Sequence, residues 1–391
     1  MTLLERRPGH PADDETPPMG TAAPTPAPWS PPGSPPGSPP RPLPTATQVS
    51  PRRLSALGTD DLAEFAIAAF VAFHAVWFLR VLLDWDGILG AALLWYLAFV
   101  AVHFLIVSFR LTSAVATDRL VTTCVWSVGV VVSGVLAWMV GYVVVKGAKL
   151  ISWSFLTQDL STVGALDAGG GAAHALVGTI EQVGLATVIV VPIAVLTAVY
   201  LHEYDGKLAA PIRFVVDALS GLPSIVAGLL MFTIWPSFEP SGVKASAALL
   251  VLMLPPITRA TEEILRTVPD PLREASLALG APRWRVIMQV VLPTARSGLL
   301  TAVLLGIARA IGETAPVILT ALGSSVMNTN PLSGAQASLP TFVWALIRVP
   351  DKTQNDRAWG GALLLVMFVL VLFATARVVS ARGDRRLGRR R

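Results

Sequence analysis

The sequence predicts an all-α protein that crosses a membrane several times, and three observations support this fold class. Only 14% of the 391 residues are charged and 53% are hydrophobic, whereas soluble domains carry about a quarter charged residues. The hydrophobic residues gather in uncharged runs such as 120–145, 185–201 and 361–375. A helix needs roughly 20 such residues to cross the hydrocarbon layer, and the strands of a barrel are shorter. The expected fold is therefore a polytopic membrane helix bundle.

Eight runs have the length and composition of membrane spans. They are 62–83, 89–109, 120–145, 174–201, 211–235, 244–264, 297–320 and 358–379. If the N-terminus is inside, lysines and arginines are concentrated in the cytoplasmic connections, as the positive-inside rule requires. We therefore predict a multi-pass protein of the cytoplasmic membrane with both termini cytoplasmic. The membrane also explains the net charge of +5, so no nucleic-acid partner is expected.

The composition changes along the chain divide it into four segments. Residues 1–55 form a Pro-rich cytoplasmic tail, which we expect to be disordered because it cannot bury enough apolar surface. Residues 56–115 hold the first two spans, 116–380 the remaining six, and 381–391 form a basic cytoplasmic tail. A Pro-rich ligand for a partner is the other interpretation of the first segment.

The longest cytoplasmic connection, about 262–296, carries its own helix signals. Asp270 and Pro271 suit an N-cap and a first helical turn, Gly280 suits the end of that helix, and Pro282 suits the start of another. We therefore expect two short amphipathic helices outside the bilayer. Any long loop can contain a surface helix, so this feature alone does not indicate a function.

The spacing within this connection is more specific. Glu274-Ala275-Ser276, Gly280 and the run 290–293 (Val-Val-Leu-Pro) stand at separations that resemble the EAA loop of binding-protein-dependent ABC importers. The family pattern is Glu-Ala-Ala, Gly and Ile-x-Leu-Pro, so Ser276 and Val290 are mild departures. The resemblance implies that this is a coupling loop, whose Glu274, Ala275, Ser276 and Gly280 contact a separate ATPase subunit.

The chain itself is expected to be a transport subunit and not an enzyme. It has no Gly-x-x-x-x-Gly-Lys-Ser/Thr phosphate-binding loop. We therefore expect no cofactor in this chain, with ATP and Mg bound by the partner ATPase. The sequence also shows no His, Cys and carboxylate cluster with metal-ligand spacing, so no metal site is predicted.

Two arginines in apolar runs are the strongest candidates for a substrate pathway. Arg309 lies near the middle of the run 298–321, where a charge is expensive unless it faces a cavity or a partner. Glu313 follows four residues later, on the same helical face, and Pro316 is expected to kink the helix locally. The pair is either a neutralised structural bridge or an anion site. Arg259, near the inner end of its span, is either a pathway residue or a boundary arginine.

Three motifs together resemble phosphate-specific transport permeases of the PstA type. They are Ala308–Pro316 (ARAIGETAP), Leu222–Gly228 (LPSIVAG) and Tyr200–Tyr204 (YLHEY), and the similarity runs from about Leu120 to Val379. Sulfate and molybdate permeases share an Arg and Gly-Glu element but continue Phe-Gly-Ala where this chain has Thr-Ala-Pro.

The resemblance implies a six-span ABC importer permease core plus two extra N-terminal spans, and import of inorganic phosphate. Arg309, Glu313, Arg259, Thr314 and Ser224 are the candidate pathway residues. The implied partners are a homologous permease of the PstC type, an ATPase dimer of the PstB type, an extracytoplasmic binding protein of the PstS type and membrane lipid. Two alternatives stay open: a permease for another oxyanion such as sulfate or molybdate, and a non-transporting membrane sensor or scaffold.

Overall fold

The structure is a computed structural model of the chain. It describes residues 59–110, 113–164, 167–204, 206–235 and 237–388, with side chains described from 62 to 378 within these ranges. The Pro-rich tail 1–55 and the last residues of the basic tail lie outside the described residues. The predictions for those segments stay predictions.

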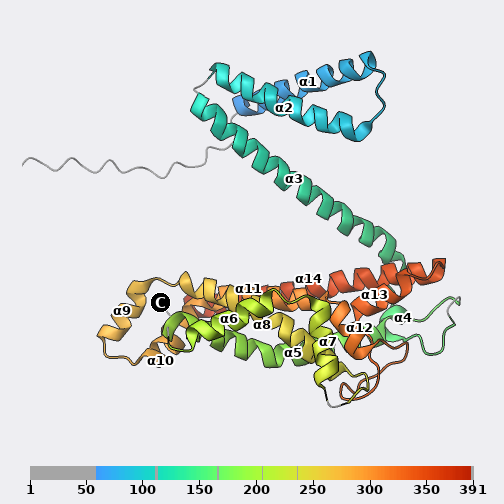
Figure 1. The fold of residues 1–391 in the computed structure, drawn as a ribbon, viewed down its shortest axis with the longest axis vertical. Helices are drawn as coiled ribbons and strands as arrows, with labels where there is room; N and C mark the ends of the chain where they lie inside the picture. Colours follow the sequence, from blue (N-terminus) through green and yellow to red (C-terminus); the bar gives the residue numbers. More distant parts are fainter. Residues whose placement is uncertain (1–58, 111–112, 165–166, 205, 236, 389–391) are drawn as a thin grey trace, which may run out of the picture. The chain divides into compact units, whose positions relative to one another are not determined.

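The regular elements of the described residues are all helices, which confirms the all-α prediction (Figure 1). Seven helical segments are long and apolar enough to cross a membrane, and one bent helix pair raises the number to eight. The main helices are α1 (Thr59–Leu82), α2 (Ile88–Arg110), α3 (Ser113–Gly147), α4 (Trp153–Thr157), α5 (Ala173–Val199), α6 (Ala209–Ser220), α7 (Ser224–Ile234), α8 (Gly242–Arg266), α9 (Asp270–Ala278), α10 (Arg283–Val286), α11 (Leu292–Ile311), α12 (Ala315–Ala321), α13 (Leu339–Ile347) and α14 (Lys352–Gly388).

The chain divides into two compact units, Met1–Cys124 and Val125–Arg391, and the division falls inside α3. In the first unit α1 packs against α2. Glu64 of α1 is buried and paired with Arg110 at 3.2 Å and with Arg119 at 3.1 Å, so the start of α3 is tied to α1. Both α1 and α2 have the length and composition of spans. That they are two additional transmembrane helices stays a prediction.

The second unit is built around α5 and α8, which pack against each other. Ala186, Ala194 and Ala198 of α5 are fully buried, and small residues of this kind let two helices approach closely in a membrane. The largest core cluster lies where α5, α8, α11 and α12 meet, with α14 packed against it. Its members are Val183, Ala186, Val190, Ala194, Ala245, Leu249, Met253, Ile257, Ala310, Ile311, Val317 and Ala321.

A smaller core cluster lies at each end of the second unit. The end that holds α9 and α10, called the α9 end below, contains Ala198, Val199, Leu265, Val268, Val286, Ile287, Val291 and Ala295. The opposite end holds α4, α12 and α13 (Figure 1) and is called the α13 end. Its cluster contains Phe155, Ala172, Ala175, Ala337, Leu339, Phe342 and Leu364. The C-terminal part of α14 lies at the α9 end (Figure 1).

The run 211–235 is not one straight span as predicted. It forms α6 and α7, which are bent by 108° relative to each other. Gly221 ends α6, and Pro223 precedes α7 in an extended conformation (ψ 137°). A proline disfavours the helical conformation of the residue before it and cannot donate its own backbone bond. The break is therefore encoded at Leu222-Pro223, which the hydrophobicity of the run conceals.

The predicted second short helix of the coupling loop also differs from expectation. It begins after Pro282 as predicted, because Pro282 is the N-cap residue of α10. However, α10 does not end before the membrane span begins. It continues through a π-helical turn, η3 (Ile287–Val291), into α11, so that Arg283–Ile311 forms one candidate span. A π turn can accommodate a local irregularity without ending a helix, and Pro293 lies in the first turn of α11, where it is tolerated.

Candidate functional site

Arg309 lies where the predicted span 297–320 is broken. Gly312 N–H donates to the Arg309 carbonyl and Glu313 N–H donates to the Ala310 carbonyl, both at 3.1 Å. Such tightened bonds satisfy carbonyls at the end of a helix. Pro316, in the first turn of α12, has no N–H to continue α11. The expectation that Arg309 lies mid-helix, with Glu313 one turn further on the same face, is therefore wrong.

The Arg309 side chain is exposed, and no carboxylate of the described residues is paired with it. Its neighbours Ala310 and Ile311 belong to the largest core cluster, so Arg309 stands at the middle level of the unit, between the two end clusters. A guanidinium at this depth is costly against hydrocarbon. It therefore requires a partner outside the described chain, such as another subunit, water or an anion. The alternative of a neutralised bridge to Glu313 is not what the structure contains.

Ser224 and Thr314 mark the starts of two helices that pack together. Ser224 is the first residue of α7, and Thr314 is the N-cap residue of α12. Gly228 permits the contact, because a Cβ atom there would lie 2.8 Å from the Pro316 Cα atom. The structure therefore brings together two of the motifs that carry the family resemblance. Among the described residues, neither hydroxyl has a hydrogen-bond partner.

Arg259 lies on α8, close in level to Arg309. Ile257 of α8 packs against Gly306 of α11, where a Cβ atom would meet the isoleucine Cγ1 atom at 2.3 Å. Gly306 is one helical turn from Arg309. The two candidate arginines therefore belong to neighbouring turns of packed helices.

Arg259 also lines a pocket of about 200 Å³ between α6 and α8. Its charged lining residues are Arg213, Asp217, Arg259, Glu262, Glu263 and Arg266. Arg259 is paired with Asp217 of α6, and Glu262, whose side chain is 11% exposed, is paired with Arg213 at 2.9 Å and with Arg266 at 3.1 Å. Arg213 and Asp217 are four residues apart on α6, but each of them binds a residue of α8. The charges balance within this cluster.

The four predicted coupling residues lie on α9 and at its end. Glu274 and Ala275 are exposed, Ser276 is half-buried, and none of the α9 residues is buried. The helix begins at Asp270 as expected, although the N-cap residue is Pro269 and the Asp270 carboxylate accepts from Arg273 at 2.8 Å. An exposed helix with small residues leaves a surface that another protein can cover.

Gly280 ends α9 in the way that its sequence position predicts. Its φ of +80° lies in the left-handed region, where side chains with a Cβ atom are strained. The Gly280 N–H donates to the Leu277 carbonyl at 2.9 Å and the Ala281 N–H to the Ser276 carbonyl at 3.3 Å. These two bonds form a Schellman motif.

Two large apolar side chains beside this turn were not singled out from the sequence. Leu279 is 89% exposed and Trp284 is 56% exposed, and the Arg285 guanidinium lies 5.3 Å from the centre of the Trp284 ring. Exposed aromatic residues of this kind often anchor protein interfaces. The signal was present in the sequence, since both flank the Gly-Ala-Pro turn that ends the helix.

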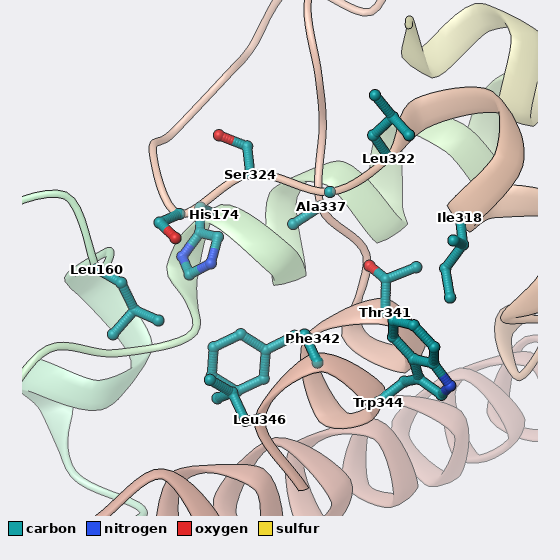
Figure 2. Close-up of a pocket in the computed structure, with 13 residues that line it drawn as sticks. Leu160, His174, Ile318, Leu322, Ser324, Ala337, Thr341, Phe342, Trp344 and Leu346 are labelled. Atoms are coloured by element: carbon teal, nitrogen blue, oxygen red, sulfur yellow. The ribbon is translucent and has the colours of Figure 1, made fainter. Parts of the chain in front are cut away.

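A second pocket lies at the α13 end and holds none of the predicted site residues (Figure 2). Its volume is about 290 Å³, and its lining is mostly apolar, with Leu160, Phe342 and Leu346 around the His174 ring. His174 is 2% exposed, and its Nδ1 atom has no hydrogen-bond partner among the described residues. A lone histidine at the start of an apolar run gives no sequence signal that would have pointed to this pocket.

Two buried amides hold the segment before α13 against α5. The Gln336 amide nitrogen donates to Glu181 at 2.5 Å and to the Asn328 carbonyl at 2.9 Å, and its oxygen accepts from Gln182 at 3.0 Å. Gln336 and Gln182 are each 1% exposed. Glu181 of α5 therefore binds a residue of the loop before α13.

Asp159 joins the two loops at the α13 end. The Ser161 hydroxyl donates to its carboxylate at 2.7 Å, and the Met327 N–H donates to it at 3.0 Å. These hydrogen bonds, first that of the Ser161 hydroxyl, lower the pKa of Asp159 below its usual value because they favour the ionised form. The carboxylate is thus a fixed acceptor that links residue 159 to the segment before α13.

Comparison with known proteins identifies the family of this chain. The family described as binding-protein-dependent transport system inner membrane component matches residues 190–389, half of the chain. The chain belongs to this family. The match includes α8, the α9 turn and the break at Arg309, and it leaves α1 and α2 outside. Together with the apolar helices, family membership makes the chain a multi-pass inner-membrane protein.

Phosphate transport permeases of other bacteria are similar to this chain over most of their length. It is 40% identical over 256 residues to the phosphate transport system permease protein PstA 1 of Mycobacterium tuberculosis (strain CDC 1551 / Oshkosh), which covers 64% of this chain and 84% of that protein. It is 39% identical over 251 residues to the phosphate transport system permease protein PstA of Yersinia pestis, covering 63% and 84%.

A solved structure of the inward-facing MetNI methionine ABC transporter is also similar. The sequence identity is 23%, with 54% of this chain and 93% of that chain covered, and the TM-score is 0.42.

Proposed function

We propose that the chain is the permease subunit of an ATP-driven importer that carries inorganic phosphate across the cytoplasmic membrane. The main support for phosphate as the substrate is the 40% identity to a phosphate permease over 84% of that protein. The run Thr314-Ala315-Pro316, which separates the phosphate pattern from the sulfate and molybdate pattern, supports the same substrate.

The assembly follows from the same proposal. The chain pairs with a homologous permease of the PstC type, an ATPase dimer of the PstB type and an extracytoplasmic phosphate-binding protein of the PstS type. ATP and Mg are bound by the ATPase, and this chain has no catalytic site of its own. The α9 end faces the cytoplasm, and both termini are cytoplasmic. The exposed surface of α9, with its small residues Ala275 and Ser276, supports docking of the ATPase at that end.

Arg309 is the proposed contact for the anion. Its planar guanidinium matches phosphate oxygens in a bidentate geometry, and no carboxylate of the described residues competes for it. Arg259 is the second contact, although an anion there has to compete with Asp217, which holds the arginine in this structure. Ser224 and Thr314 lie at the starts of two packed helices and supply hydroxyl donors to the same pathway.

Glu313 is proposed to distinguish phosphate from sulfate. At neutral pH phosphate keeps at least one proton and sulfate keeps none. A half-buried carboxylate beside the pathway can accept that hydrogen and repel a fully ionised competitor. In Glu313→Gln the amide can donate instead, so this variant should transport sulfate better relative to phosphate than the unchanged chain does.

Anion-dependent uptake tests the proposed function. The chain is purified with its co-encoded partners, reconstituted in proteoliposomes and supplied with ATP on the side of the ATPase. The proposal predicts uptake of labelled phosphate that stops when ADP replaces ATP and that unlabelled sulfate or molybdate in excess does not suppress. If sulfate or molybdate were taken up instead, the chain would be a permease for that oxyanion. If ATP drove no anion uptake, the sensor or scaffold alternative would replace transport.

A further inference from the structure

Arg273 of α9 binds two other elements of the α9 end. Its side chain is only 14% exposed. The guanidinium donates to Glu203 at 3.0 and 3.2 Å, to Asp270 at 2.8 Å, to the Val268 carbonyl at 2.7 Å and to the Leu265 carbonyl at 2.9 Å, and it lies 3.3 Å from His202 Nε2. Arginine suits this position, because its five N–H donors form a rigid fork that lysine lacks.

The partners of Arg273 belong to the ends of the two central helices. Glu203, whose side chain is 11% exposed, lies in η2 (Tyr200–Tyr204), the π-helical turn that continues α5. The Leu265 carbonyl lies near the end of α8 and the Val268 carbonyl lies beyond it. Carbonyls at a helix end lack partners within the helix. One side chain thus binds α9, α5 and α8 together, and it explains the His-Glu of the YLHEY motif.

Without Arg273, α9 is weakly attached to the rest of the unit. None of its residues is buried. Among the described residues, Arg273 is the one α9 side chain that forms a hydrogen bond to α5 or α8; the Ser276 hydroxyl donates to the Leu272 carbonyl within α9. The position of α9 relative to α5 therefore depends mainly on the bond between Arg273 and Glu203.

We propose that Arg273 is a positioning residue that transmits displacement of the coupling helix to α5, with Glu203 as the receiving group. The inference rests on the proposed function. A partner that docks on the exposed face of α9 pushes a helix that is held to η2 by two hydrogen bonds. Because α5 continues from η2 into the largest core cluster, the displacement reaches the helices around Arg309.

Asp270 provides a matched control for Glu203. Both carboxylates bind Arg273, at 2.8 and 3.0 Å, but Asp270 belongs to α9 itself and its side chain is 83% exposed. Glu203→Gln and Asp270→Asn therefore each remove one charge and keep the shape of the side chain. Only the first weakens the connection from α9 to α5. If Arg273 merely stabilised the loop, the two variants would behave alike.

Two measurements on the reconstituted complex test the proposal. Phosphate taken up per ATP hydrolysed should fall about tenfold in Glu203→Gln, because hydrogen bonds to a carboxylate are replaced by weaker ones to a neutral amide. It should fall less than about twofold in Asp270→Asn. Hydrogen exchange gives a second readout that needs no substrate. Addition of ATP with vanadate should change exchange both in α9 and in residues 196–204 of Asp270→Asn, but in α9 alone of Glu203→Gln.

The outcomes separate this inference from the proposed function. Suppose that the unchanged complex takes up no phosphate, while Asp270→Asn and Glu203→Gln show the two different exchange patterns. The transport proposal then fails, and the role of Arg273 stands. If Glu203→Gln and Asp270→Asn give the same uptake per ATP and the same exchange pattern in residues 196–204, Arg273 does not transmit motion and the inference is overturned. Binding of the ATPase to both variants, measured by co-purification, verifies that α9 is still folded.

Discussion

The two ends of the second unit use their basic side chains differently. At the α13 end, Lys244 is 1% exposed and Arg357 is 3% exposed. Both bind backbone carbonyls: Lys244 those of residues 237 and 239, and Arg357 those of residues 167 and 169. Toward the α9 end, Arg213 and Arg273 each bind a carboxylate on another element, and Arg259, nearer the middle level, does the same. Arg273 also donates to two backbone carbonyls.

This difference indicates which end can change its shape. A carbonyl is fixed in the backbone, so the loops at the α13 end cannot move without losing a bond to a buried charge, which is costly. A carboxylate on a side chain can rotate, and an arginine can exchange one carboxylate for another or for an anion. At the α9 end, arginines can therefore exchange their carboxylate partners, whereas the buried basic residues hold the loops of the α13 end in one arrangement.

The largest effect on stability is expected at the α13 end. Gln336→Leu removes a buried amide, and Glu181, Gln182 and the Asn328 carbonyl each lose the hydrogen bond that they form with it. Since an unsatisfied buried group costs about 1–3 kcal/mol, we expect a loss of roughly 3 kcal/mol in the free energy of unfolding. Denaturant unfolding in detergent measures it, with Asn330→Ala, an exposed change in the same loop, as the control. Equal stability of the two variants would contradict a rigid α13 end.

At the α9 end, a backbone change should affect coupling more than stability. Gly280→Val forces a β-branched residue to adopt a φ of +80°, which costs about 1–2 kcal/mol. Apart from residues 279–281 themselves, no described atom lies within 4 Å of the added Cβ. The turn after α9 shifts, and phosphate uptake per ATP should fall while membrane insertion is retained. Asn tolerates the left-handed region, so Gly280→Asn should lose much less. Normal uptake by the valine variant would show that this turn does not couple.

The smallest expected effect is a dependence on pH at the α13 end. The pKa of Asp159 is lowered in the folded chain, so its contribution is present above the unfolded pKa and is lost as the pH falls through the folded pKa. Protection of the Met327 amide against exchange should therefore decrease on acidification, relative to the Leu160 amide, which donates to the Ser325 carbonyl at 3.0 Å. Asp159→Asn should remove this difference, and an unchanged ratio at all pH values would contradict the assignment.

The sequence predicted the helices and the α9 turn well because their signals are local. Apolar runs mark helices, and Gly280 and Pro282 mark a helix end and a helix start. The breaks were harder to predict, because 211–235 and 297–320 are apolar over most of their length and Pro223 and Pro316 are weak signals within them.

The pairing of charges could not be read from the sequence. Arg309 and Glu313 are four residues apart, yet the helix ends between them. Glu203 and Arg273 are seventy residues apart, and they are paired because the α9 end folds back on α5. Pairing of this kind depends on the tertiary packing of helices, which periodicity along one chain does not specify. The family motifs identified Glu203 as a residue of interest without indicating its partner.

The most direct test is phosphate uptake by a complex that carries Arg309→Gln. We expect uptake to fall by about tenfold or more, since one charge-assisted contact is lost, while membrane insertion and assembly are retained. Arg309→Lys should recover part of the uptake, because a point charge lacks the bidentate fork. Arg348→Gln, at an exposed arginine over the Trp344 ring, should transport normally. Normal uptake by Arg309→Gln, or recovery when Glu313→Gln is added to it, would contradict an anion pathway at Arg309.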